Sequence, residues 1–217
     1  MMRFVLLSLL IIALFTGCNF DKTADRTNTS PPDVAQWSEV SLNKKCQNVL
    51  DNKDLLYDVD TNEEMYISKF LDNRELTMSK YSIVDLNGDS SPEVVGWLSR
   101  GANDYWGFLV LHYENDMVYA YELAYRAFNE LKSDGTFSFS SSVSDHGIGK
   151  IEFLSGTYKV NKIAYSETEY GTQKVSYYVD NNSVSKKDFE SYISKQSEKR
   201  DVEWDEITIN STKQCCI

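Results

Sequence analysis

Residues 106–123, WGFLVLHYENDMVYAYEL, decide the fold that the sequence predicts. Two runs of aliphatic, aromatic and β-branched residues flank Asn115 and Asp116, a pair with the chemistry of a tight turn. Four residues of the second run occupy alternate positions and so share one face of a strand: Met117, Tyr119, Tyr121 and Leu123. The stretch therefore predicts two antiparallel strands joined by a short turn.

The two-residue alternation continues on both sides of this hairpin and predicts about eight strands in all. Their expected ranges are Tyr81–Val84, Glu93–Leu98, Trp106–Tyr113, Met117–Leu123, Thr136–Ser142, Lys150–Phe153, Thr157–Ser166 and Lys174–Val179. A final strand is expected at Val202–Ile209.

Three other segments have helical signals. Loose amphipathic spacing predicts a helix from about Trp37 to Leu56, and a capping-box pattern that starts at Thr61 predicts another at 62–73. A second capping pattern at Ser185 opens a helix near the C-terminus. Because this order lacks a βαβ rhythm, we expect an α+β fold, mainly one antiparallel sheet with two N-terminal helices and one C-terminal helix.

The composition is that of a folded, acidic protein. Its 22 Lys and Arg face 33 Asp and Glu, so the formal net charge is −11, which argues against nucleic acid as a partner. With 14 Tyr, 10 Phe and 4 Trp there is material for a sizeable core, and this aromatic content argues against disorder.

The first 17 residues have the pattern of a signal peptide. Arg3 is followed by an apolar run from Phe4 to Phe15, which is too short for a stable membrane span. The small residues before Cys18 resemble a bacterial lipobox, which implies cleavage before Cys18 and acylation of that residue with palmitate-like chains. An ordinary signal peptide with an incidental cysteine is the alternative. Cleavage also removes Arg3 and lowers the net charge to −12.

The resemblance to lipoproteins implies a membrane anchor in the cell envelope. Residues 18–36 are polar, contain Pro31 and Pro32 and lack periodicity, so they are expected to form a tether before a single domain at 37–217. Asn19 follows the lipidated residue, which implies the outer membrane if the source is Gram-negative.

One local motif has the pattern of a metal loop. In residues 85–93, DLNGDSSPE, oxygen-bearing residues recur at alternate positions. The candidate Ca²⁺ ligands are Asp85, Asn87, Asp89, the carbonyl of Ser91, and Glu93, and Ca²⁺ prefers six to eight oxygens. The alternative is a metal-free loop in which Asp85 and Asn87 accept backbone N–H groups as Asx-turns.

The motif resembles the calcium loops of EF-hand-like and FG-GAP repeats. Two departures are present, because Ser90 stands where glycine makes the turn and no Glu stands at the twelfth position. A dissociation constant on the order of 10⁻⁴ M or weaker is expected. Together with residues 177–189, YYVDNNSVSKKDF, the motif also resembles a group of uncharacterised secreted and lipid-anchored bacterial proteins, which implies a fold precedent and no activity.

The sequence offers few residues for catalysis. His112 and His146 are the only histidines, and His112 has the pattern of a sheet residue. His146 lies in a serine-rich segment without a nucleophile-elbow pattern, which argues against acyl transfer. The tyrosine face at residues 117–123 suits either recognition of a protein or glycan, or the core of the sheet.

Three cysteines remain after lipidation. Cys46, Cys215 and Cys216 would lie in an oxidising compartment, and a bridge between the two neighbours at 215 and 216 would be strained. We therefore expect a disulfide from Cys46 to Cys215 or Cys216, the alternative being a C-terminal tail without fixed pairing.

The sequence favours a non-catalytic, lipid-anchored envelope protein that acts as a binding or interaction module, with Ca²⁺ at the Asp85 loop as the stabilising ion that the motif predicts. One alternative is an inhibitor or immunity-type lipoprotein, whose acidic body would bind a basic toxin or cell-wall hydrolase. The other is a glycan hydrolase with paired carboxylates.

Overall fold

The hairpin predicted at residues 106–123 forms the centre of a seven-stranded sheet. The computed structural model describes residues 42–101, 104–172 and 174–209, all within the compact unit Glu39–Ile217. The predicted signal peptide and tether, residues 1–36, lie outside the described residues.

The first sheet is antiparallel except at one pair of strands. Its spatial order is β12 (Asp205–Ile209), β3 (Thr77–Val84), β4 (Glu93–Ser99), β5 (Tyr105–Glu114), β6 (Met117–Ala124), β1 (Leu56–Asp58) and β2 (Glu63–Met65). Only β1 and β6 run parallel among these pairs. Asn115 and Asp116 have positive φ angles between β5 and β6, as the turn chemistry predicts for a two-residue hairpin loop.

The second sheet is antiparallel throughout. Its order is β11 (Asn182–Val184), β10 (Val175–Val179), β9 (Thr157–Thr168), β8 (His146–Leu154) and β7 (Phe137–Ser140). The helices are α1 (Lys44–Leu50), α2 (Ile67–Arg74), the short 3₁₀ helix η2 (Tyr125–Ala127) and α3 (Lys186–Glu198).

The predicted α+β class with mostly antiparallel strands is confirmed, whereas the number and grouping of strands differ. About eight strands plus a final one were expected in a single sheet, and the described residues form twelve strands in two sheets. The short strands β1, β2 and β11 escaped prediction because three residues are too few for an alternation to be recognised.

The helices correct two expected boundaries. Among the described residues the first helix is Lys44–Leu50, because the chain turns after it and Leu56 becomes part of β1, while residues 37–41 of the expected helix lie outside the described part of the chain. The helix expected at 62–73 begins instead at Ile67, since the Thr61 hydroxyl donates to the Asp58 carboxylate, 2.9 Å away, rather than capping a helix. The cap at Ser185 is confirmed, because its hydroxyl oxygen accepts the Asp188 N–H.

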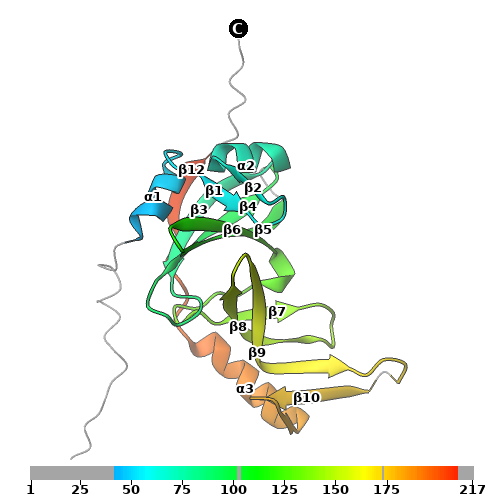
Figure 1. Ribbon diagram of the computed structural model, residues 1–217. Coiled ribbons are helices and arrows are strands. Elements are labelled where there is room, and N and C mark those ends of the chain that lie inside the picture. Colours follow the sequence, from blue (N-terminus) through cyan, green and yellow to red (C-terminus); the bar gives the residue numbers. More distant parts are fainter. Residues whose placement is uncertain (1–41, 102–103, 173, 210–217) are drawn as a thin grey trace, which may run out of the picture. The chain divides into compact units, whose positions relative to one another are not determined.

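Two apolar layers cover the two faces of the first sheet. On one face α1 and α2 bury residues such as Cys46, Phe70 and Leu71 against β4 and β5 (Figure 1). On the other face the β8–β9 hairpin packs against β5 and β6, with Ile151 in a shared core (Figure 1).

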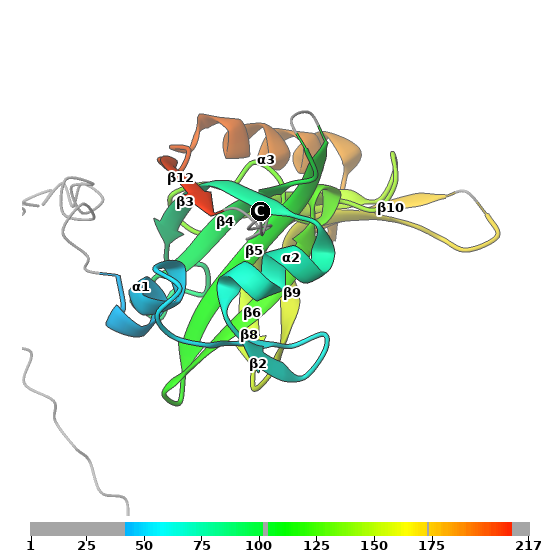
Figure 2. The ribbon, with the colours of Figure 1, turned by 90° about the horizontal axis from the view of Figure 1, so that it is seen from above.

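The third helix belongs to the second sheet. Phe189 of α3 is buried and contacts the rings of Tyr177 and His146. Seen from above, α2 lies over β5 and β6, well separated from α3 (Figure 2). No helix in the described ranges is both long and apolar enough to cross a membrane.

Candidate functional site

The loop predicted to bind calcium is closed by its own side chains. The Asp85 carboxylate accepts N–H groups of Gly88 and Ser90 at 2.7 and 2.9 Å. Asn87 accepts the Asp89 N–H at 3.1 Å, and Asp89 accepts the Ser91 N–H at 2.7 Å. These are the bonds of the Asx-turn alternative.

The fifth predicted ligand, Glu93, is turned toward the protein interior. One oxygen accepts the Leu86 N–H at 2.8 Å and the other lies 3.0 Å from Nδ1 of His112. Within residues 42–101, 104–172 and 174–209, no three His, Cys, Asp or Glu side chains form a group that could hold a metal ion. Calcium at this loop stays a prediction.

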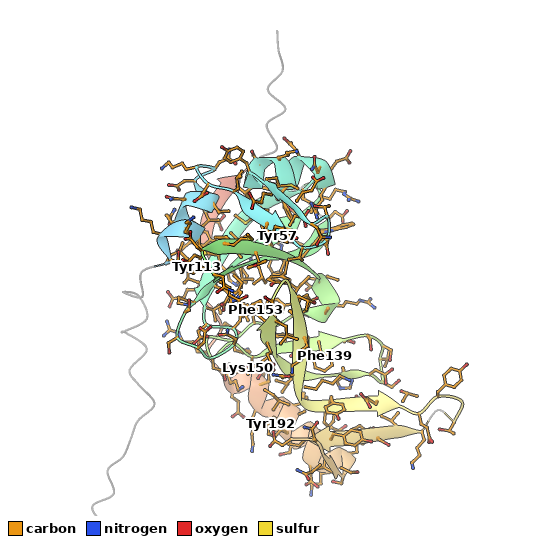
Figure 3. The ribbon with its side chains drawn as sticks, in the orientation of Figure 1. Tyr57, Tyr113, Phe139, Lys150, Phe153 and Tyr192 are labelled. Atoms are coloured by element: carbon orange, nitrogen blue, oxygen red, sulfur yellow. The ribbon has the colours of Figure 1, made fainter. Side chains whose placement is uncertain are left out.

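His112 links the loop to the second sheet. It is buried, as its position in an apolar strand predicts, and its ring stacks on Phe153 with centroids 3.9 Å apart. Figure 3 shows Phe153 where the β8–β9 hairpin meets the first sheet. Burial raises the pKa of Glu93, although hydrogen bonds from His112 and the Leu86 N–H act in the opposite direction.

The second histidine does not lie in a catalytic arrangement. The Ser166 hydroxyl is 3.3 Å from Nδ1 of His146, but Ser166 is buried and donates to the Ser144 carbonyl at 2.6 Å. Asp145 accepts hydrogen bonds from Thr168 and Ser142 instead of orienting the imidazole. These serines hold the start of β8 to β9 rather than presenting a nucleophile.

The tyrosine face at residues 117–123 is the core face of the first sheet. Tyr121 and Leu123 are buried, and Tyr119 packs at the edge of the same core. The Tyr121 hydroxyl is the one buried side-chain polar atom in the described part of the chain that lacks a hydrogen-bond partner. Burial raises the pKa of this phenol.

Cys46 is buried in the apolar layer beneath α1 and has no disulfide partner among the described residues. Burial raises its pKa to about 12, which disfavours the thiolate that forms disulfides. Cys215 and Cys216 lie outside the described residues, as does the lipidation site Cys18, so both predictions on cysteine stay open.

A second cluster, which the sequence did not point to, is organised by Arg74 at the end of α2. Its guanidinium donates to Asp58 at 2.8 Å and to Glu122 at 2.9 Å, and it lies 3.9 Å from the centre of the Phe70 ring. Asp58 is 0% exposed and also accepts the Thr61 hydroxyl. Arg74 therefore fixes two carboxylates that come from different strands.

A β-bulge brings Trp106 to this cluster. Leu98 pairs with Gly107 but Ser99 pairs with Tyr105, so Trp106 is an extra residue in β5. The bulge turns its indole to the helix-covered face, where its N–H donates to Glu122. Without the bulge, the alternation would place Trp106 on the opposite face with Phe108.

These residues line a cavity of about 390 Å³, which we name the Trp106 cavity. Its walls are Asp60, Trp106, Glu122 and Ala124. The guanidinium of Arg100 lies 4.1 Å from the centre of the Trp106 ring. Within the part of the chain that the structure describes, the Asp60 carboxylate has only a long ion pair, 3.8 Å to Arg74.

Electrostatics distinguish the acidic residues of the cavity. Partial burial and then the negative charge of Asp58 raise the pKa of Asp60, and the positive charge of Arg74 opposes them. Glu122 is held on one oxygen by Trp106 and on the other by Arg74. Asp60 is therefore the carboxylate with most acceptor capacity left for a ligand.

An aromatic cluster packs with Phe108 on the other face of the first sheet, and we name it the Trp97 cluster. Its members are Lys80, Trp97, Tyr105, Tyr125 and Trp204. The three other rings meet Trp97 edge-on at 5.6 to 5.9 Å. Nζ of Lys80 lies 4.3 Å from the centre of the Trp97 ring, a cation–π contact.

No protein-family model matches this chain, and no curated protein or solved structure is significantly similar to it. The positions of its side chains are therefore the basis on which a function is proposed.

Proposed function

We propose that this protein is a non-catalytic, lipid-anchored binding module of the bacterial cell envelope, and that it holds a carbohydrate at the Trp106 cavity. The lipobox-like sequence at Cys18 supports the anchor and the envelope location. The observation that carries the choice of ligand is the partly exposed indole of Trp106, which lines one cavity together with the carboxylates of Asp60 and Glu122.

A sugar matches this combination of groups. Its C–H faces pack on an aromatic ring, and its hydroxyls donate to carboxylates that already lie in fixed positions. The cavity of about 390 Å³ falls within the usual range of ligand pockets. Arg74 and Trp106 already hold Glu122 in one position. Binding therefore costs less side-chain entropy at Glu122 than it would at a mobile carboxylate.

The residues do not favour the glycan-hydrolase alternative. A glycosidase needs one carboxyl group as a proton donor and a second as base or nucleophile. Asp58 and Glu122 are both committed to Arg74 as hydrogen-bond acceptors, and Asp58 is inaccessible. Asp60 alone remains, which supports binding over hydrolysis.

Calorimetric titration tests the proposal on the mature chain, with Cys18→Ser so that it stays in solution. The probes are glucose, N-acetylglucosamine, their β-1,4-linked oligomers of two to six units, and fragments of purified peptidoglycan. Trp106→Ala should weaken binding at least tenfold, which corresponds to about 1.4 kcal/mol for a lost ring contact. Asp60→Asn should weaken it several-fold without unfolding, because this side chain is 61% exposed.

The matched control is Tyr170→Ala. It removes a fully exposed ring from the turn between β9 and β10 and should leave affinity unchanged. Absence of binding to every probe, or equal affinity of Trp106→Ala and the parent chain, refutes the proposal.

The net charge supports a second candidate, inhibition of a basic partner. A body with a formal charge of −12 after signal-peptide removal would steer a cationic toxin or hydrolase toward itself. A pull-down from envelope extract with washes of rising salt tests this. Recovery of one basic hydrolase, released by salt, supports inhibition, and its absence rejects it.

A further inference from the structure

The charges around the Trp106 cavity are unevenly paired. Asp60 and Glu122 line the cavity, and the buried Asp58 is held by the same Arg74 as Glu122. Arg74 donates to Asp58 at 2.8 Å and to Glu122 at 2.9 Å, whereas it lies 3.8 Å from the carboxylate of Asp60. One guanidinium is therefore shared by three carboxylates, and Asp60 is the most weakly paired of them.

Arg100 supplies a second positive charge, which is directed at other groups. Its guanidinium lies 4.1 Å from the centre of the Trp106 ring and donates to the backbone carbonyl of Arg74 at 3.3 Å. Asp58 and Glu122 raise the pKa of Asp60 by their negative charge, and Arg74 lowers it. Even with both guanidinium groups counted, the three carboxylates leave one negative charge in excess.

The indole of Trp106 also favours a positive charge beside it. Arg100 already makes a cation–π contact with this ring. The face of an indole and a carboxylate with free acceptor capacity are groups that attract an ammonium. A ligand with a carboxylate or sulfate would instead be repelled by Asp60 and Glu122, because like charges in one site are unfavourable.

We propose that the carbohydrate bound at the Trp106 cavity carries a free amino group, as in the glucosamine units of a de-N-acetylated glycan, and that its ammonium pairs with Asp60. The inference rests on the proposed carbohydrate function of the cavity. An ammonium has three N–H donors and no acceptor, so it uses the acceptor capacity that Asp60 retains. N-acetylation removes the positive charge, so an acetylated sugar loses this ion pair.

Calorimetric titration with two matched oligomers tests the inference on the mature chain that carries Cys18→Ser. The probes are the β-1,4-linked tetramers of glucosamine and of N-acetylglucosamine. At about pH 6 a sugar amine is protonated and a carboxylate is ionised, so the glucosamine tetramer should bind about fivefold more tightly than the acetylated tetramer. At about pH 9 the amine is neutral, and this preference should disappear.

Two charge-removing variants distinguish the cavity from the acidic surface of the whole protein. Asp60→Asn removes the carboxylate but keeps the size of the side chain, so the two tetramers should bind this variant equally well. The matched control is Glu190→Gln, which removes an exposed negative charge from α3 and should retain the preference. Trp106→Ala should weaken the binding of both tetramers.

Three outcomes separate the two proposals. If the acetylated tetramer binds the parent chain as tightly as the glucosamine tetramer while the amine is protonated, the amine is not recognised, and the inference is overturned while the cavity function stands. If the preference survives in Asp60→Asn, the amine is attracted by the acidic surface as a whole, which also overturns the inference. If neither tetramer nor any other carbohydrate probe binds, the cavity function itself fails and the inference fails with it.

Discussion

Replacing Arg74 should destabilise the protein severely, because this residue neutralises a carboxylate that has no access to water. We choose Arg74→Met, which keeps an unbranched stem over Phe70 and removes the guanidinium. Among the described residues, the change leaves Asp58, 0% exposed, with only the Thr61 hydroxyl and the Asp60 N–H as donors.

The magnitude follows from the burial of each partner. Breaking a buried ion pair by removing one partner costs about 3–5 kcal/mol, because the remaining charge is uncompensated. The bond to Glu122, 21% exposed, adds less, and the 3.8 Å pair with Asp60 adds almost nothing. For a domain of this size, the expected loss lowers the melting temperature by about 6–20 °C.

Urea denaturation followed by circular dichroism measures the free energy of unfolding. Lys186→Met is the matched control, because Lys186 forms an exposed pair with Glu190 on α3 and its loss should cost less than about 0.5 kcal/mol. Asp58→Asn in the Arg74→Met background should recover part of the stability by removing the stranded charge. A cost below about 1 kcal/mol for Arg74→Met, or no recovery in the double variant, refutes the reasoning.

Four further predictions concern single residues. The pKa of Glu93 is raised in the folded state, so protonation of Glu93 favours folding. This contribution to stability is fully present below the pKa of Glu93 in the unfolded chain and is lost as pH rises through its pKa in the folded protein. Glu93→Gln should therefore flatten this part of the plot of unfolding free energy against pH, as measured by urea denaturation. If the Asp85 loop binds Ca²⁺ with a dissociation constant near 10⁻⁴ M, 1 mM Ca²⁺ should raise the free energy of unfolding by about 1.4 kcal/mol, and Asp89→Ala should abolish this gain. Equal melting curves with and without chelator would leave only the Asx-turn alternative. If Cys46 is bridged to the C-terminal tail, a reductant should lower the urea concentration at the midpoint of unfolding. If Cys46 is an unbridged buried thiol, the reductant should change nothing, and mass spectrometry should detect alkylation of Cys46 only after unfolding. Tyr121→Phe should stabilise the fold by about 1 kcal/mol because it removes an unpaired buried hydroxyl, and a measured loss would show that the hydroxyl has a partner.

The parts of the fold that could be predicted from the sequence are those that local interactions determine. The β5–β6 hairpin is encoded by alternation and by the turn at Asn115 and Asp116, all within 20 residues of chain. The start of α3 is encoded by Ser185 and Asp188, three positions apart. Neither feature depends on what the rest of the chain does.

The errors occur where a distant residue changes the local outcome. Thr61 has the pattern of a helix cap, but the buried Asp58 accepts its hydroxyl, and Asp58 is itself held by Arg74. Glu93 stands at the right spacing for a calcium ligand, but it meets His112, 19 positions away in the sequence. In both cases a partner supplied by the tertiary structure competes with the local motif.

The candidate site illustrates the same limit most clearly. Nothing near Trp106 in the sequence distinguishes it from the other aromatic residues of its strand, and alternation alone assigns it to the face of Phe108. Its actual position depends on a one-residue register shift between β4 and β5, which can be known only once those strands are paired. Because of that shift the indole contacts Glu122, which is held by Arg74, and Arg74 also holds the carboxylate of Asp58. Strands β1, β5 and β6 and helix α2 must therefore assemble before the cavity exists. A site built in this way requires the folded protein for binding, and loss of the Arg74 contacts should therefore weaken carbohydrate binding even where the chain still folds.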